Sequence, residues 1–265
     1  MYDKRTYSVQ HGGLAKIVFV RYNGRNTIQG SNLSRQRAGE SMRICSIDGK
    51  TVSIFPDNKS GSLVIYLNTV SDEGCQVYEA AQTAGCPSFN LVAISNLDWN
   101  HDMAPWDSPA VFKGGEAFAG GADNYLWLLV EEIIPKAEKE LAGPPAWRGI
   151  AGYSLAGLFA LYAVYQTDVF SRVGGMSGSL WFPGFKEYIC SHEPKRRPDR
   201  IYFSLGDREA KTRNPVLKTV QENTETIHAH FLAQGVDTVF QLNPGNHFVQ
   251  GIERTVAGIR WLLGR

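Results

Sequence analysis

The feature that most constrains the fold of this 265-residue chain is a repeated alternation of short apolar runs with helix-like stretches. Several runs are apolar on both faces, which is typical of strands covered by helices on each side. Helical periodicity is found in the stretches that begin at 123, 155, 216 and 252. The pattern predicts a mostly parallel sheet in an α/β fold. The expected strands are 51–55, 63–67, 89–95, 147–151, 172–176, 200–205 and 238–242.

The N-terminal 50 residues do not share the alternation of strands and helices found in the rest of the chain. The N-terminal 50 residues contain short mixed segments with no helical period, and we expect them to supply antiparallel strands at one sheet edge. In the helix that begins near Asp123, that residue is the expected N-cap, and Pro135 with Gly143-Pro144-Pro145 is expected to limit the helix and its extension. Because no linker or internal repeat interrupts the sequence, we predict a single domain over residues 1–265, with its core from about residue 50.

Composition and charge argue against several classes of partner. The chain has 27 Lys and Arg against 26 Asp and Glu, a formal net charge of +1, so neither nucleic acid nor a membrane is an expected partner. No apolar run reaches the roughly 18 residues that span a bilayer. The N-terminus lacks the apolar segment of a signal peptide, so we expect a cytoplasmic protein. The cysteines show no zinc-site spacing and are expected to be reduced thiols, with no metal or cofactor.

Residues 147–165, WRGIAGYSLAGLFALYAVY, are a short apolar strand, a turn and an apolar helix. The turn fits the pattern G-x-S-x-G with Ala156 in the last position and Gly157 directly after it. Small residues are needed because a Cβ two residues before or after the serine would collide with the neighbouring strand and helix. The turn also places the serine hydroxyl beside a helix N-terminus, whose free N–H groups favour a developing oxyanion. Ser154 is therefore the candidate nucleophile.

A serine nucleophile needs a histidine base. His228 and His230 lie in a predicted helix and are expected at the surface, whereas His192 lies in a charged loop. His247 lies in the loop NPGNHF, between the last predicted strand and the last helix. That position favours His247 as the base.

The base in turn needs an acid to orient it, and two carboxylates follow the strand at 200–205. Asp207 comes directly after Gly206 and is placed to bond the backbone of its own turn. Glu209 has one more methylene and lies further along the loop, where it can reach His247. We favour Glu209 as the acid and keep Asp207 as the alternative.

These residues together resemble the Putative esterase family of α/β hydrolases, which includes enterochelin-esterase-like and S-formylglutathione-hydrolase-like enzymes. The resemblance is carried by GYSLAG, SLGDRE, GNHF, the loop at 96–106 and the segment SGSLW at 177–181. It implies an α/β-hydrolase fold, with helices on both faces of the central sheet, and a serine carboxylic-ester hydrolase. The reaction would pass through an acyl-enzyme on Ser154, with His247 as base and Glu209 as orienting acid. An acyltransferase with the same triad and a non-catalytic scaffold are the alternatives.

In this fold two backbone N–H groups form the oxyanion hole. The first would come from Leu155 and the second from the loop after Ser95, with Leu97 favoured over Asn96. Aromatic residues in the surrounding loops either line the substrate pocket or anchor a long loop. The expected ligand is a small-molecule ester, and a homo-oligomer is left open. The candidate pocket residues are Trp99, His101, Trp106, Tyr153 and Trp181.

Overall fold

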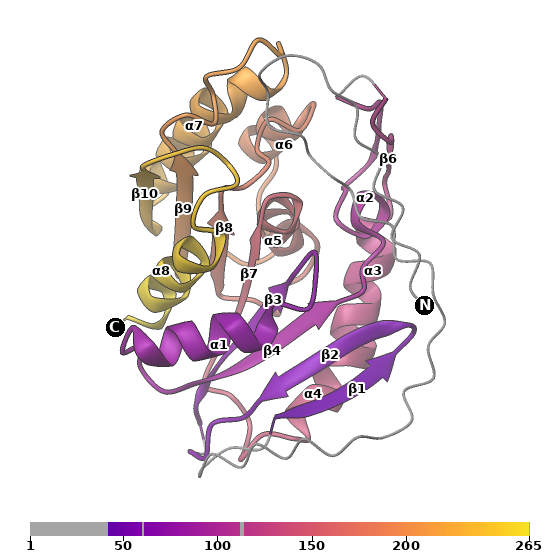
Figure 1. Ribbon diagram of the computed structural model, residues 1–265, viewed down its shortest axis with the longest axis vertical. Helices are drawn as coiled ribbons and strands as arrows, with labels where there is room; N and C mark the ends of the chain where they lie inside the picture. The colour runs from indigo at the N-terminus through magenta and orange to yellow at the C-terminus, as the bar shows by residue number, and fades with distance from the viewer. Residues whose placement is uncertain (1–41, 60, 112–113, 265) are drawn as a thin grey trace, which may run out of the picture. The chain divides into compact units, whose positions relative to one another are not determined.

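The structure is a computed structural model that describes residues 42–59, 61–111 and 114–264. Its central feature is an eight-stranded sheet in the order β1-β2-β4-β3-β7-β8-β9-β10 (Figure 1). The strands are β1 (Arg43–Ile47), β2 (Lys50–Phe55), β3 (Leu63–Asn68), β4 (Phe89–Ser95), β7 (Arg148–Tyr153), β8 (Arg172–Met176), β9 (Arg200–Gly206) and β10 (Asp237–Asn243).

The sheet is mostly parallel, as the sequence predicts. Strands β4, β3, β7, β8, β9 and β10 pair in parallel, whereas β2 is antiparallel to β4 and β1 is antiparallel to β2. The antiparallel pair lies at the N-terminal edge, which confirms that part of the expectation. The rest of the N-terminal segment lies outside the described residues, so the single domain over 1–265 stays a prediction.

Helices cover both faces of the sheet. The sheet therefore separates the apolar core into two clusters, one on each face. One cluster includes the residues of α3 (Ala122–Leu128), α4 (Ile134–Glu138) and α5 (Leu155–Gln166). The other includes residues of α1 (Gly74–Thr83) and α8 (Gly251–Leu263), which contact each other (Figure 1). Every residue of β4 is buried, because a strand in this position is covered on both faces. The remaining α-helices and strands are α2 (Trp99–Asp102), α6 (Phe185–Ser191), α7 (Val220–Ala233), β5 (Asp107–Ser108) and β6 (Phe118–Ala119).

The helical segment after residue 121 corrects two sequence predictions. Its N-cap is Gly121, so Asp123 lies inside the first turn of α3 instead of preceding it. Pro135 does not limit the segment, which continues to Glu138. A π-helical stretch, Leu129–Ile133, separates α3 from α4 and places Pro135 in the first turn of α4, a position where proline is tolerated.

Helix α5 directly follows β7 and is the most deeply buried helix of the described chain. Each of its residues from Leu155 to Tyr165 is buried, which explains its uniformly apolar sequence. A helix without a polar face fits only between the sheet and a further layer of helices. Among the described residues, no helix combines the length and hydropathy needed to cross a membrane.

Candidate active site

Ser154 occupies a strained turn between β7 and α5. Its φ of 61° and ψ of −125° lie in a region that residues other than glycine rarely adopt. Such strain persists only where the surrounding structure fixes the backbone. Here the Ser154 N–H donates to the Met176 carbonyl (3.1 Å), and the Ser154 carbonyl accepts from the N–H of Ser179 (3.0 Å). These bonds tie the turn to the segment that follows β8.

The small residues around Ser154 are required by close packing. A Cβ on Gly152 would lie 2.4 Å from the Cβ of Ala156, and one on Gly157 would lie 3.0 Å from the carbonyl oxygen of Gly152. The Ala156 methyl therefore fits because Gly152 has no side chain. This packing allows alanine at position 156, where the pattern G-x-S-x-G has glycine.

Three side chains from three strand ends meet at the carboxyl edge of the sheet. His247 Nε2 lies 3.1 Å from Ser154 Oγ, and His247 Nδ1 lies 2.8 Å from a Glu209 carboxylate oxygen. Ser154 follows β7, Glu209 follows β9 and His247 follows β10. Both imidazole nitrogens are thus engaged, one by a hydroxyl and one by a carboxylate, as a nucleophile–base–acid arrangement needs.

Asp207, the alternative acid, has a different partner. Its carboxylate is exposed and accepts the N–H of Gly245 at 2.9 Å, and its own N–H donates to the Asn243 carbonyl at 2.8 Å. Asp207 therefore fastens the turn after β9 to the start of the loop that carries His247. The structure brings Glu209, and not Asp207, to the imidazole.

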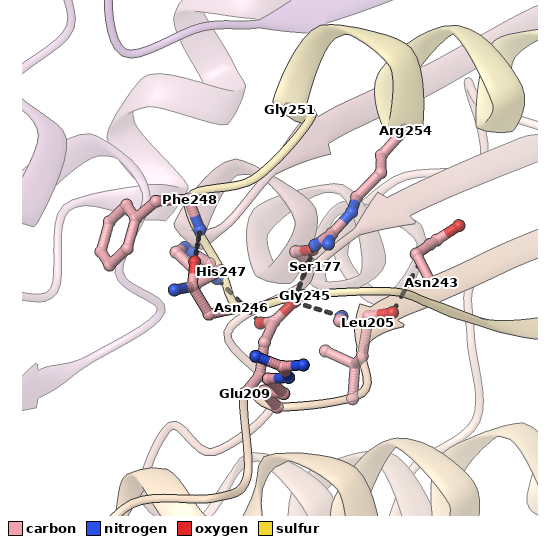
Figure 2. A network of polar contacts seen from close by, with 12 residues as sticks. Ser177, Leu205, Glu209, Asn243, Gly245, Asn246, His247, Phe248, Gly251 and Arg254 are labelled. Carbon is pink, nitrogen blue, oxygen red and sulfur yellow. Dashed lines mark hydrogen bonds and ion pairs between the residues drawn. The ribbon is translucent and has the colours of Figure 1, made fainter. Parts of the chain in front are cut away.

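The Glu209 carboxylate is buried and saturated with donors (Figure 2). Its side chain is 5% exposed. The oxygen that does not face His247 accepts from the Ser177 hydroxyl (2.8 Å), from the N–H of Gly206 and from Arg254 (3.2 Å). Burial by itself raises the pKa of the Glu209 carboxyl. The hydrogen bond and charge of His247, with the bonds from Gly206 and Ser177, outweigh burial and lower that pKa below its usual value.

The sequence profile of the family described as Putative esterase matches residues 70–251. The chain belongs to this esterase family. That span includes the strand ends that carry Ser154, Glu209 and His247, and family membership makes the protein a carboxylic ester hydrolase.

The esterase also resembles individual proteins. It is 23% identical over 194 residues to the uncharacterized protein YbbA of Bacillus subtilis, a match that covers 70% of this chain and 78% of YbbA. An IroE-like serine hydrolase from Shewanella oneidensis superposes with a TM-score of 0.68 at 16% identity, over 85% of this chain and 80% of that one. The siderophore hydrolase EstA of Aspergillus nidulans gives a TM-score of 0.63 at 18% identity, over 85% and 93%. At these identities the solved structures confirm the α/β-hydrolase fold.

Sequence reasoning missed the roles of three residues that support the esterase's histidine and acid. The Tyr153 hydroxyl donates to the His247 carbonyl at 2.7 Å, so this tyrosine, expected in the substrate pocket, holds the histidine loop. Ser177 and Arg254 both bond Glu209. The role of Arg254 could have been suspected from one feature of the sequence. It is an arginine on the face of α8 that is buried, four residues before Gly258.

The other histidines that follow Ser154 lie away from the nucleophile. His192 is exposed at the end of α6 and stacks on Tyr188. His230 contacts Gln234 one turn along α7. His228 is half-buried with its ring near Phe203 and Phe240, so the expectation that it lies at the surface is wrong. It faces β9 and β10 because α7 packs on these strands.

The three tryptophan candidates for the pocket pack against the apolar core. Trp106 donates to the Pro183 carbonyl at 3.0 Å and contacts Phe182 edge-on, which fits the anchoring of a loop. Trp181 lies two residues after Ser179, whose hydroxyl is 3.3 Å from that of Ser154. Trp99 is partly buried against the core cluster that contains α5.

His101, the remaining pocket candidate, is held in place from two sides. Its ring lies against Gly121, where a Cβ would come within 2.1 Å of it, and its Nδ1 is 3.0 Å from the Asp102 carboxylate. Asp102 also pairs with Lys50 at the start of β2. The loop after β4 is therefore bound to the antiparallel edge of the sheet.

The two expected oxyanion donors lie in different surroundings. Leu155 is the first residue of α5, so its N–H has no acceptor within the helix. Leu97 follows Asn96, which has a φ of 59°, in the loop after β4. However, β3 and not β4 pairs with β7. The loop at 69–73, which follows β3, is therefore one strand nearer to Ser154 than the loop of Leu97.

Proposed function

We propose that the esterase hydrolyses its substrate through an acyl-enzyme on Ser154, with His247 as general base and Glu209 as orienting acid. The observation that carries this proposal is the continuous contact from the Ser154 hydroxyl through both imidazole nitrogens to the Glu209 carboxylate, at 3.1 and 2.8 Å. The lowered pKa of Glu209 supports the same roles, because an ionised carboxylate can stabilise an imidazolium.

The proposed reaction has two halves. Ser154 Oγ attacks the ester carbonyl carbon while His247 Nε2 takes the hydroxyl proton. The tetrahedral intermediate then collapses, the alcohol leaves with the proton from His247, and the acyl group stays on Ser154. In the second half, water attacks the acyl carbon while His247 takes its proton. The second tetrahedral intermediate then collapses, Ser154 Oγ leaves with the proton from His247, and the acid is released.

The oxyanion of each tetrahedral intermediate needs two N–H donors. We assign the first to Leu155, at the N-terminus of α5. For the second, the strand order favours an amide of the loop after β3, in which Val70 is the second residue, over Leu97. Val70 is 61% exposed, so this loop lies at the protein surface.

Rapid mixing with p-nitrophenyl acetate tests the acyl-enzyme. We expect a burst of p-nitrophenolate equal to the enzyme concentration, followed by slower turnover, whenever deacylation limits the rate. Acid quenching and peptide mass mapping should find the acetyl group on Ser154. Turnover with acetyl trapped on another residue would contradict the proposal. Product analysis with added alcohol distinguishes hydrolysis from acyl transfer, because a transferase would yield the acetyl ester of that alcohol.

Glu209 and Asp207 provide a matched pair of variants in one turn. Glu209→Gln should lower kcat/KM by about 10³–10⁴-fold, because a neutral amide cannot stabilise the imidazolium. Asp207→Asn should change kcat/KM by less than about threefold, because the amide oxygen can still accept the Gly245 N–H. Steady-state kinetics on both variants make the comparison. A larger loss for Asp207→Asn would assign the acid to Asp207.

A further inference from the structure

Arg254 is a buried cation at the centre of the network that surrounds Glu209. It lies in the first turns of α8 and its side chain is 2% exposed. One terminal nitrogen lies 3.2 Å from Glu209, 3.1 Å from the Ser177 hydroxyl and 3.3 Å from the Tyr153 hydroxyl. The other donates to the Pro244 carbonyl at 3.0 Å. Figure 2 shows the side chain reaching from α8 toward Ser177.

These contacts reach the ends of four neighbouring strands. Tyr153 ends β7, Ser177 follows β8, Glu209 follows β9 and Pro244 follows β10. An arginine can make all of them because its planar guanidinium carries several donors in fixed directions. A fully buried charge is costly unless it is paired, and Glu209 is the carboxylate that pairs with Arg254.

The two oxygens of the Glu209 carboxylate have different partners. One oxygen accepts from Ser177, Gly206 and Arg254, and the other contacts His247 alone among the described residues. We propose that Arg254 is a positioning residue that holds Glu209 ionised and aimed at His247, and whose fixed charge extends the neutral, proton-accepting form of His247 to lower pH. This inference rests on the proposed triad.

The charges of the titratable groups that face this cluster determine whether removal of Arg254 strengthens or weakens proton binding by the His247–Glu209 pair. The phenols of Tyr153 on β7 and Tyr202 on β9 both have raised pKa values, caused first by burial, so they stay neutral. Asp207 is exposed and bonded to Gly245, and Glu253, beside Arg254 on α8, is exposed. The charges in contact are therefore those of Arg254, Glu209 and protonated His247. Removing Arg254 leaves Glu209 uncompensated, so the His247–Glu209 pair binds a proton more tightly.

The test is the pH dependence of kcat/KM in Arg254→Met, Arg254→Lys and the control Arg200→Met. The acid limb of the profile reports protonation of the essential base in the free enzyme. Loss of the charge in Arg254→Met should move this limb upward by about one pH unit, with KM unchanged and the alkaline plateau within about tenfold of the wild type. Arg254→Lys keeps the charge and should return the limb to within about 0.3 units of its original position.

Arg200 is the control because it also bonds α8, through the Trp261 carbonyl, but from the opposite end of β9. Arg200→Met should leave the limb in place. An equal loss of kcat/KM at every pH in Arg254→Met, with no movement of the limb, would overturn the inference. If Arg254→Met does not fold, as judged by circular dichroism, Arg254→Lys decides: a limb that moves up by a full unit despite the retained charge overturns the inference. Failure of the triad itself is a separate result, because it would show as activity retained in Ser154→Ala.

Discussion

The Ser154→Ala variant is expected to lose activity toward p-nitrophenyl acetate by about 10⁴–10⁶-fold in kcat/KM, the range found when a triad nucleophile is removed. The physical reason is that the variant loses the hydroxyl that lies 3.1 Å from His247 Nε2 and would form the acyl-enzyme bond. The fold should be unaffected, because alanine keeps the Cβ that already tolerates a φ of 61° at this position. The measurements are steady-state kinetics and a thermal melt of the purified variant.

Ser179→Ala is the control for this variant, since its hydroxyl lies 3.3 Å from that of Ser154. A fluorophosphonate probe should label the wild type and Ser179→Ala and should not label Ser154→Ala. Persistent labelling of Ser154→Ala, or its loss in Ser179→Ala alone, would move the nucleophile to the neighbouring serine.

The strand-end positions of Ser154, Glu209 and His247 could be predicted from sequence for a topological reason. In a parallel sheet all carboxyl ends lie on one edge, so residues that follow different strands are brought together whatever their separation along the chain. The runs that form β7, β9 and β10 are apolar and bounded by glycine, which made their ends visible. The selection of Glu209 over Asp207 depended on a two-residue offset within one turn, and the bonds of that turn agree with it.

The order of the strands could not be predicted from the same pattern. Nothing in the local sequence indicates that β3 lies between β4 and β7, because adjacent parallel strands share no sequence signal. The oxyanion loop was therefore sought after Ser95, whereas the pairing of β3 with β7 favours residues 69–73. The network of Tyr153, Ser177 and Arg254 was hidden for a related reason. Each residue gains its role only from contacts between elements far apart in the chain.

Backbone strain near the site was visible in the sequence only at Ser154, where the pattern G-x-S-x-G predicts a strained turn. Among the described residues, five that are not glycine have positive φ: Asp48, Asn96, Ser154, Ser177 and Gln250. All but Asp48 lie in the segments that follow β4, β7, β8 and β10. Glycine would have marked such turns in the sequence, but serine, asparagine and glutamine do not. Strain of this kind is common where a fixed side-chain direction matters more than local stability.

Replacing His247 by alanine should lower kcat/KM by about 10⁴–10⁶-fold, because the Ser154 hydroxyl then has no base within reach. The histidine loop should keep its position, since the Tyr153 hydroxyl bonds the backbone carbonyl of residue 247 and not its ring. The loss should thus appear in kcat, with little change in the thermal midpoint. Fluorophosphonate labelling should slow in parallel, because the probe also needs a deprotonated hydroxyl.

The matched control is the double variant His228→Ala, His230→Ala on α7. It should retain turnover within about twofold but melt at a lower temperature, because His228 packs near Phe203 and Phe240. The two variants should therefore have opposite effects. His247→Ala should lose turnover and keep its thermal midpoint, whereas the double variant should keep turnover and lose thermal stability. If the double variant lost turnover while His247→Ala stayed within tenfold of the wild type, the base would lie on α7 and not in the loop after β10.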